Sequence, residues 1–339
     1  MMNKVFINRF FQIKSLEKFG LLEIFGISRF CLVTLTLYIK YILCIILKND
    51  IKFAFNSISN DWETFAHEKE LEILEDYAKK QKRIIPLLSL LFQISVVLYV
   101  TIPISPIFVD IIIPLNKSRH VSIDLARSYN AEKDEHFYLI VIYYFCFLEN
   151  NIISILPVEF THLLLAYHYC ALFGIISYRI QRAIDNDSEK NIANVEIDRT
   201  YRKICDAMET YTRIDVCNVL LKKLSIMNCI INLIIAFSLA TYMILFTTAY
   251  LDDTTNAFSY GYSILVHLFY AFIHNYIGQI IMDYSLHPFY ELYDTKWYRQ
   301  PLKIQKFVLQ GLLRTSKQYV QGIGSFYIMS MRGFFSVRN

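Results

Sequence analysis

Residues 224–250 read LSIMNCIINLIIAFSLATYMILFTTAY and contain no charged side chain. A helix needs about 20 consecutive apolar residues to cross the hydrocarbon core of a bilayer. The bilayer core offers no water to the backbone N–H and C=O groups, so a single crossing segment must be a helix. This stretch therefore predicts a membrane-spanning helix.

The composition of the whole chain agrees with this stretch. Of the 339 residues, 55% are hydrophobic and 19% are charged, whereas about a quarter of an average soluble domain is charged. The net charge of +4 is too small to predict binding to nucleic acid. The seven cysteines include no C-x-x-C pair, which argues against a disulfide framework. Together these features predict an all-α, polytopic membrane bundle.

Six apolar segments are candidates for membrane spans. They cover residues 30–47, 84–104, 137–157, 224–250 and 262–282, with a weaker segment at 322–337. Apolar residues continue from 137 to 180, and no polar turn surrounds Pro157. We therefore expect one helix that crosses the membrane there and continues beyond it. Residues 1–29 alternate charged and apolar side chains, so they do not predict a cleavable signal peptide.

The distribution of Lys and Arg predicts the orientation of these spans. Segments 48–83, 179–223 and 283–321 hold 22 Lys and Arg residues, whereas 105–136 and 251–261 hold 4. Cytosolic loops carry the excess of positive charge, so the first three segments are predicted to be cytosolic. This orientation is inverted relative to rhodopsin-like receptors.

The N-terminal segment does not follow this distribution. Residues 1–29 hold five Lys and Arg residues, although the alternation of spans places them outside the cell. One further helix before this segment would restore the rule. We therefore expect a chain that lacks one N-terminal membrane helix.

Signatures of enzymes and metal centres are weak in this sequence. Glu159 and His162 form an E-x-x-H pair, with His168 following. A di-iron bundle requires that motif twice and two further glutamates, so these residues indicate contacts between helices. The Walker loop, G-x-S-x-G, H-E-x-x-H and G-x-G-x-x-G patterns do not occur. The sequence predicts no enzyme, no cofactor and no metal ion.

Two polar segments predict helices outside the membrane. In 48–83, Ser59, Asn60 or Asp61 is positioned to cap a helix with acidic first turns and basic last turns. In 299–318, Pro301 begins an amphipathic helix that could lie on lipid headgroups or pack on partner helices. The aromatic strip HPFYELYDTKWYR at 287–299 lies between the last two apolar segments, within the predicted cytosolic segment 283–321, and an aromatic belt at the headgroups is one interpretation of it.

Four stretches resemble the insect odorant receptor family, in the form expanded in ants, bees and wasps. They are ISNDW with YAKKQKR (58–62 and 77–83), IIPLNKSRH (112–120), HYCALFGIISYRI (168–180) and the long run DYSLHPFYELYDTKWYRQPLKIQKFVLQGLLRTSKQYVQGIGSFYIMSM (283–331). The last follows the family's D-x-S, Y-x-x-x-WY and G-x-F-x-x-x-S pattern, and the resemblance covers about residue 30 to the end. The sister family of gustatory receptors is an alternative, but its T-Y-x-x-x-x-x-Q-F signature is missing.

The resemblance implies an odorant-gated, non-selective cation channel. Tuning subunits of this family form heterotetramers with a common co-receptor, in the dendrite membrane of olfactory neurons. Four parts are expected here: an N-terminal segment (1–29), a transmembrane bundle (30–282), a cytosolic anchor (283–321) and a shortened pore helix (322–339). About six of the family's seven membrane helices are present, so a non-conducting truncated isoform is a further alternative.

Candidate site residues follow from the resemblance and the predicted topology. Anchor candidates are Tyr293, Trp297, Tyr298, Phe307 and Leu312, and pore-helix candidates are Gly322, Ser325, Ile328 and Met329. A volatile or cuticular apolar ligand needs aromatic side chains with few polar groups, here in the outer half of the bundle. These ligand candidates are Phe92, Tyr99, Tyr138, Val141, Phe145, Tyr242, Phe246, Tyr262, His267 and Tyr270. A transporter would need internal repeats with broken helices, and a structural membrane protein would need no pocket.

Overall fold

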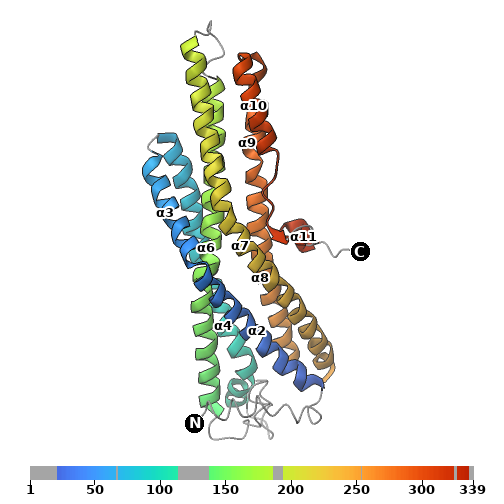
Figure 1. Cartoon of the computed structure of the whole chain (residues 1–339). Helices are drawn as coiled ribbons and strands as arrows, with labels where there is room; N and C mark the ends of the chain where they lie inside the picture. Colours follow the sequence, from blue (N-terminus) through green and yellow to red (C-terminus); the bar gives the residue numbers. More distant parts are fainter. Residues whose placement is uncertain are drawn as a thin grey trace. The chain divides into compact units, whose positions relative to one another are not determined.

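The computed structural model describes residues 21–65, 68–113, 137–185, 194–252, 254–323 and 327–335. Almost all of these residues are helical, as Figure 1 shows, which confirms the all-α prediction. The long helices are α2 (Leu21–Ile46), α3 (Lys48–Thr64), α4 (Glu68–Ile112), α6 (Phe137–Asp185), α7 (Asn194–Asp252) and α8 (Thr254–Ser285). The short elements are α9 (His287–Asp294), the 3₁₀ helix η3 (Trp297–Arg299), α10 (Leu302–Thr315), the strands β1 (Gly322–Ile323) and β2 (Tyr327–Ile328), and α11 (Met331–Phe335).

Four described helices are long and apolar enough to cross a membrane. They are Glu68–Ile102, Leu156–Ile184, Asp198–Thr248 and Ala257–Arg299, and a shorter apolar helix covers Thr34–Ile46. The predicted spans 84–104, 224–250 and 262–282 lie almost wholly within these helices. The chain is therefore a helical membrane bundle, as predicted.

Helix α6 continues without a break from Phe137 to Asp185, with Pro157 inside it. This confirms one continuous helix in place of a hairpin. Within Leu156–Ile184, a stretch of 18 apolar residues is 78% buried in the protein. Apolar residues that pack against other helices look the same in sequence as those that face lipid, so hydropathy does not separate the two.

The chain divides into two compact units. The first contains the described residues of Met1–Ile39, Gln93–Asn151 and Ile234–His267, and we call it unit 1. The second contains Lys40–Phe92, the described residues of Ile152–Leu233, and those of Leu268–Asn339, and we call it unit 2. In unit 2, α6 forms much of the core, where Cys170, Ile175, Ile176 and Ile180 are fully buried.

The predicted helix start at 59–61 is wrong. Helix α3 runs through these positions to Thr64, and the next helix begins at Glu68. Asp61 is buried and contacts His168 and Arg213, so its carboxylate binds partners from other helices. Tertiary contacts thus replace the cap that local sequence suggests.

The predicted pore helix over 322–337 is also wrong in its first part. Gly322 and Ile323 pair with Tyr327 and Ile328 as a two-stranded antiparallel hairpin, and a helix starts only at Met331. Gly322 has φ 153°, which side-chain-bearing residues rarely adopt. Glycine at this position therefore favours the hairpin over a continuous helix.

Side chains of α8 hold the segment that follows this hairpin. Asn275 Oδ1 accepts a hydrogen bond from the backbone N–H of Ser330 at 3.2 Å, and Gln279 Oε1 accepts one from Met331 at 3.1 Å. A Cβ added at Gly278 would lie 2.7 Å from the Met329 Cβ, so only glycine allows this close approach. The residues before α11 are thus fixed against α8.

Candidate functional site

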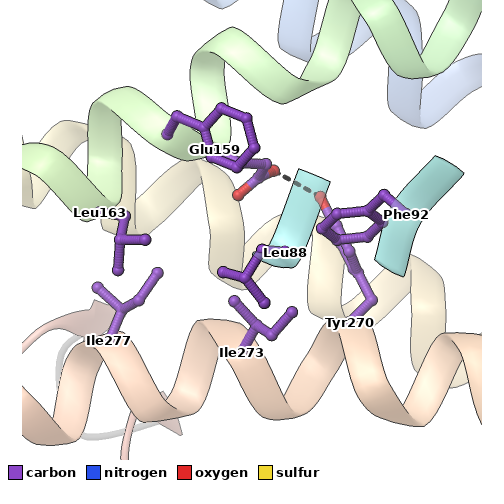
Figure 2. A pocket seen from close by; sticks show the side chains of 8 residues that line it. Leu88, Phe92, Glu159, Leu163, Tyr270, Ile273 and Ile277 are labelled. Atoms are coloured by element: carbon purple, nitrogen blue, oxygen red, sulfur yellow. Dashed lines mark hydrogen bonds between the residues drawn. The ribbon is translucent and has the colours of Figure 1, made fainter. Parts of the chain in front are cut away.

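The described pocket lies within unit 2, between three helices. Figure 2 shows its lining, which comes from α4 (Leu88, Phe92), α6 (Glu159, Phe160, Leu163) and α8 (Tyr270, Ile273, Ile277). The volume open to the centre of a water molecule is about 10 Å³. This is close to the minimum that holds one water, so a larger ligand requires side chains to move.

Helical geometry brings these residues to one place. Leu88 and Phe92 are four residues apart on α4, and Tyr270, Ile273 and Ile277 follow i, i+3, i+7 spacing on α8, so each set shares a helix face. The Phe92 ring centroid lies 6.1 Å from that of Tyr270 and 6.4 Å from that of Phe269. Phe92 is thus the aromatic wall from α4.

The polar side of the pocket is a buried ionic network. Glu159 accepts hydrogen bonds from Tyr270 Oη at 2.6 Å and from His274 Nε2 at 2.9 Å. The Lys40 ammonium contacts both the Glu159 carboxylate and the Tyr270 hydroxyl. His274 Nδ1 lies 3.1 Å from the side-chain amide of Asn232 on α7. Three helices, α2, α6 and α8, therefore meet at one carboxylate, and α7 joins the network through His274. Lys40 compensates the charge of the carboxylate in a low-dielectric interior.

Unit 1 contains a separate aromatic cluster. Tyr242 packs with Leu245 and Tyr260, and its hydroxyl lies 3.3 Å from that of Tyr99. Its ring centroid is 5.1 Å from that of His267. This cluster joins helices α4, α7 and α8 through neutral groups.

The ligand candidates are distributed over both units. Tyr99, Tyr242, Phe246 and His267 meet in the unit 1 cluster, where Phe246 packs against its core. Tyr262 donates instead to the Ser95 carbonyl at 3.0 Å. Phe92 and Tyr270 line the unit 2 pocket. Val141 and Phe145 are half-buried on α6. The side chain of Tyr138 lies outside the described part of the structure.

Six residues of the pocket were missed by sequence reasoning. They are Leu88, Glu159, Phe160, Leu163, Ile273 and Ile277. The signal that could have found Glu159 is a charged side chain within an apolar run, because such residues usually face protein or a cavity. The aliphatic residues carry no comparable signal.

The anchor candidates lie on η3, α9 and α10 of unit 2. Tyr293 and Tyr298 are exposed, at 61% and 59%. Trp297 is half-buried, Phe307 packs on Tyr201 with ring centroids 5.0 Å apart, and Leu312 is buried. The structure thus divides this set into residues that pack within the chain and residues that are available to a partner.

Helix α10 is held against α7 by polar contacts. The Lys303 ammonium donates to Asp198 at 2.9 Å, and this pairing raises the pKa of Lys303. The Arg314 guanidinium of α10 donates to Asp215 at 2.9 Å. The Tyr319 hydroxyl, just beyond α10, contacts the same carboxylate, and burial together with this hydrogen bond raises the pKa of Tyr319.

A second charged cluster joins α4, α6 and α7. Arg179 on α6 binds both carboxylate oxygens of Glu70 on α4 at 2.7 and 2.9 Å, and it donates to the Thr210 hydroxyl on α7 at 3.2 Å.

The pore-helix candidates lie in or beside the hairpin. Gly322 and Ile328 are in its strands, and Met329 is fully buried. Ser325 lies outside the described residues. Among the described residues, no group of three His, Cys, Asp or Glu side chains is placed to hold a metal ion.

Comparisons with known proteins identify a matching family. The family model described as 7tm Odorant receptor matches residues 21–339. No curated protein matches the chain.

Two solved structures share the fold. The insect olfactory receptor OR5 from Machilis hrabei in complex with eugenol has a TM-score of 0.69 at 8% identity, with 92% of this chain and 77% of that chain covered. OR5 described without a ligand has a TM-score of 0.66 at 9% identity, with the same coverage.

Proposed function

This chain belongs to the odorant receptor family, and from that premise we propose that it is a tuning subunit in which odorant binding opens a non-selective cation channel. The family consists of multi-pass membrane receptors and not of enzymes. The observation that carries the proposal is the family match over residues 21–339. We expect the channel to be a heterotetramer with the common co-receptor, in the dendrite membrane of olfactory neurons.

The proposed ligand is a small apolar molecule, volatile or cuticular. Six of the eight residues that line the pocket are aliphatic or phenylalanine, which favours an apolar ligand over a charged one. The pocket has room for about one water, so the Phe92 side chain would have to move to admit an odorant. The aromatic cluster around Tyr242 supports a second contact region of the same chemistry.

The proposed contact with partner subunits is the exposed face of α9, η3 and α10. Tyr293 and Tyr298 are large, exposed and amphipathic, which is typical of interface residues. Leu302 and Leu313 are also exposed on α10, at 66% and 73%. Large apolar and aromatic side chains exposed together on this face favour burial against a neighbouring subunit.

Patch-clamp recording tests the proposal. The chain is expressed with a co-receptor, its surface delivery is confirmed, and an odorant panel is applied. We expect odorant-evoked cation currents that require both subunits. Surface-delivered channels that respond to no odorant would contradict the proposal, and currents evoked by non-volatile tastants would favour the gustatory alternative.

A pair of tryptophan variants tests whether the ligand binds in the unit 2 pocket. Leu163→Trp adds volume to the pocket and should abolish the response. Leu87→Trp makes the same change at a position that is 56% exposed on α4, so it should leave the response intact. Equal responses of the two variants would exclude the unit 2 pocket as the ligand site.

A further inference from the structure

A second set of polar side chains is buried near the Glu159 network. His162 on α6, Asn228 on α7 and Gln321 before β1 are each 1% exposed. His162 Nδ1 lies 3.1 Å from the Asn228 amide nitrogen. Gln321 faces the same imidazole. These side chains line no part of the pocket and belong to none of the sites above.

Several atoms of this set are unsatisfied within the described part of the chain. Asn228 Oδ1 is buried without a hydrogen bond to protein, and the His162 ring and the Gln321 amide lie next to each other without the alignment of a direct hydrogen bond. The Asn232 amide atom that does not face His274 is in the same condition. Buried polar atoms in native proteins nearly always have a partner, and where protein does not supply it, ordered water does.

The two polar sets are continuous along the helices. Asn228 and Asn232 are one turn apart on α7, and Asn232 contacts His274. Glu159 and His162 are three residues apart on α6, so they share a face. We call the combined set the polar seam. It comprises Lys40, Glu159, His162, Asn228, Asn232, Tyr270, His274 and Gln321.

We infer that the polar seam holds ordered internal water, and that this water links the pocket wall to the C-terminal hairpin. At one end, Glu159 and Tyr270 line the pocket. At the other end, the Gln321 carbonyl accepts a hydrogen bond from the backbone N–H of Met329 at 2.9 Å. Gln321 thereby positions the residues immediately before α11.

The link between the pocket wall and the hairpin is inferred from the unsatisfied buried atoms. Its role in the response to a ligand rests on the function proposed above. A ligand that displaces Tyr270 changes the hydrogen bonds of Glu159, and therefore those of His274 and of the water beside Asn232. Water molecules reorient at little cost, so such a change passes to Gln321 without repacking the apolar core. Chains of hydrogen bonds with two discrete arrangements are one route by which distant sites are coupled.

Hydration is tested on the purified full-length chain without any ligand. X-ray radiolysis in ¹⁸O-labelled water oxidises side chains that lie beside bound water, whether or not they are exposed. We expect His162 and His274 to be labelled several-fold more than Tyr242, which is equally buried at 1% but lies in an aromatic cluster. Labelling of the two histidines no greater than that of Tyr242, after normalisation to the unfolded chain, would overturn the inference.

Coupling is tested by apolar replacements of similar volume. Asn228→Leu and Gln321→Leu should each raise the half-maximal odorant concentration by about tenfold, while odorant binding to the purified chain stays unchanged. The double variant should match the single variants, because the residues act in one link. Ser225→Ala is the matched control, since this buried hydroxyl on α7 donates to the Leu221 carbonyl of its own helix.

The outcomes separate the inference from the proposed function. A wild-type chain that reaches the surface without any odorant response would contradict the proposed function. The labelling result would still decide whether the polar seam holds water, because that experiment uses no ligand. If a variant loses stability but keeps the wild-type dose dependence per surface channel, the substituted residue has a structural role only. That result would overturn the proposed link between the pocket wall and the hairpin.

Discussion

The two units bury polar side chains by different means. In unit 1, the Tyr99 hydroxyl, the Tyr242 hydroxyl and the His267 imidazole meet among aromatic rings. In unit 2, Lys40 and Glu159 form an ion pair in the interior, where both side chains are buried. A neutral hydroxyl loses little when a partner moves, whereas a buried charge that loses its partner is strongly destabilising.

This difference separates two roles. A neutral aromatic cluster tolerates rearrangement, as contacts with varied ligands require. A charged network allows only a few satisfied arrangements, as a structural element with discrete states requires. The comparison therefore predicts that substitutions in the charged network of unit 2 lower stability more than substitutions in the aromatic cluster of unit 1, which is proposed as a second contact region for the ligand.

The largest expected effect comes from Glu159. Glu159→Leu leaves Lys40 buried without its carboxylate and removes the acceptor for Tyr270 and His274. The folded state should lose about 3–5 kcal/mol, measured by thermal unfolding of the detergent-solubilised chain. The double variant Lys40→Met/Glu159→Leu should recover most of that loss, and a double variant as unstable as Glu159→Leu would contradict the ionic assignment.

A smaller effect is expected at the second charged cluster of unit 2. Arg179→Met breaks both hydrogen bonds to Glu70, but the Arg179 side chain is 23% exposed, so water partly compensates. We expect a loss of about 2 kcal/mol in the same unfolding measurement. Lys82→Met, at an exposed position of α4, is the control and should unfold like the wild type.

Tyr242→Phe tests the same comparison in unit 1. It removes one neutral hydroxyl contact of 3.3 Å to Tyr99 and keeps the ring in its cluster. The loss of stability should be below about 1 kcal/mol, while the odorant dose dependence shifts. An unfolding temperature lowered as far as in Arg179→Met would remove the distinction between the units.

The smallest effect is confined to alkaline pH. The folded chain raises the pKa of Tyr319 through burial and its hydrogen bond to Asp215, so folding favours the neutral phenol. Its contribution to stability is fully present below the unfolded pKa of about 10 and is lost as pH rises through the folded value. Tyr319→Phe should unfold with less dependence on pH above 10 than the wild type, and identical pH profiles would contradict the assignment.

Much of the fold was predictable from local pattern. Pro301 and the apolar spacing after it predicted α10, which begins at Leu302 and buries Ile304, Val308 and Leu312. Proline fixes φ at a value suited to a first helical turn, and the 3.6-residue period selects one buried face. Both signals are local, so no tertiary knowledge was needed.

The candidate site was predictable only in part. Phe92 and Tyr270 were predicted and line the pocket, whereas Leu163 and Ile277 were not. Aliphatic residues are equally suited to lipid, to a core and to a pocket. Only the packing of α4, α6 and α8 decides which of these environments each residue has.

The amino-acid sequence alone determined that the chain is a helical membrane protein with long apolar rods. The reason is local, because backbone groups without access to water must pair within their own segment. The tertiary structure alone decided that Lys40 meets Glu159, that much of the apolar surface of α6 is buried in protein, and that the residues before α11 form a hairpin. These features depend on partners distant in the chain, and hydropathy records how apolar a segment is without recording what covers it.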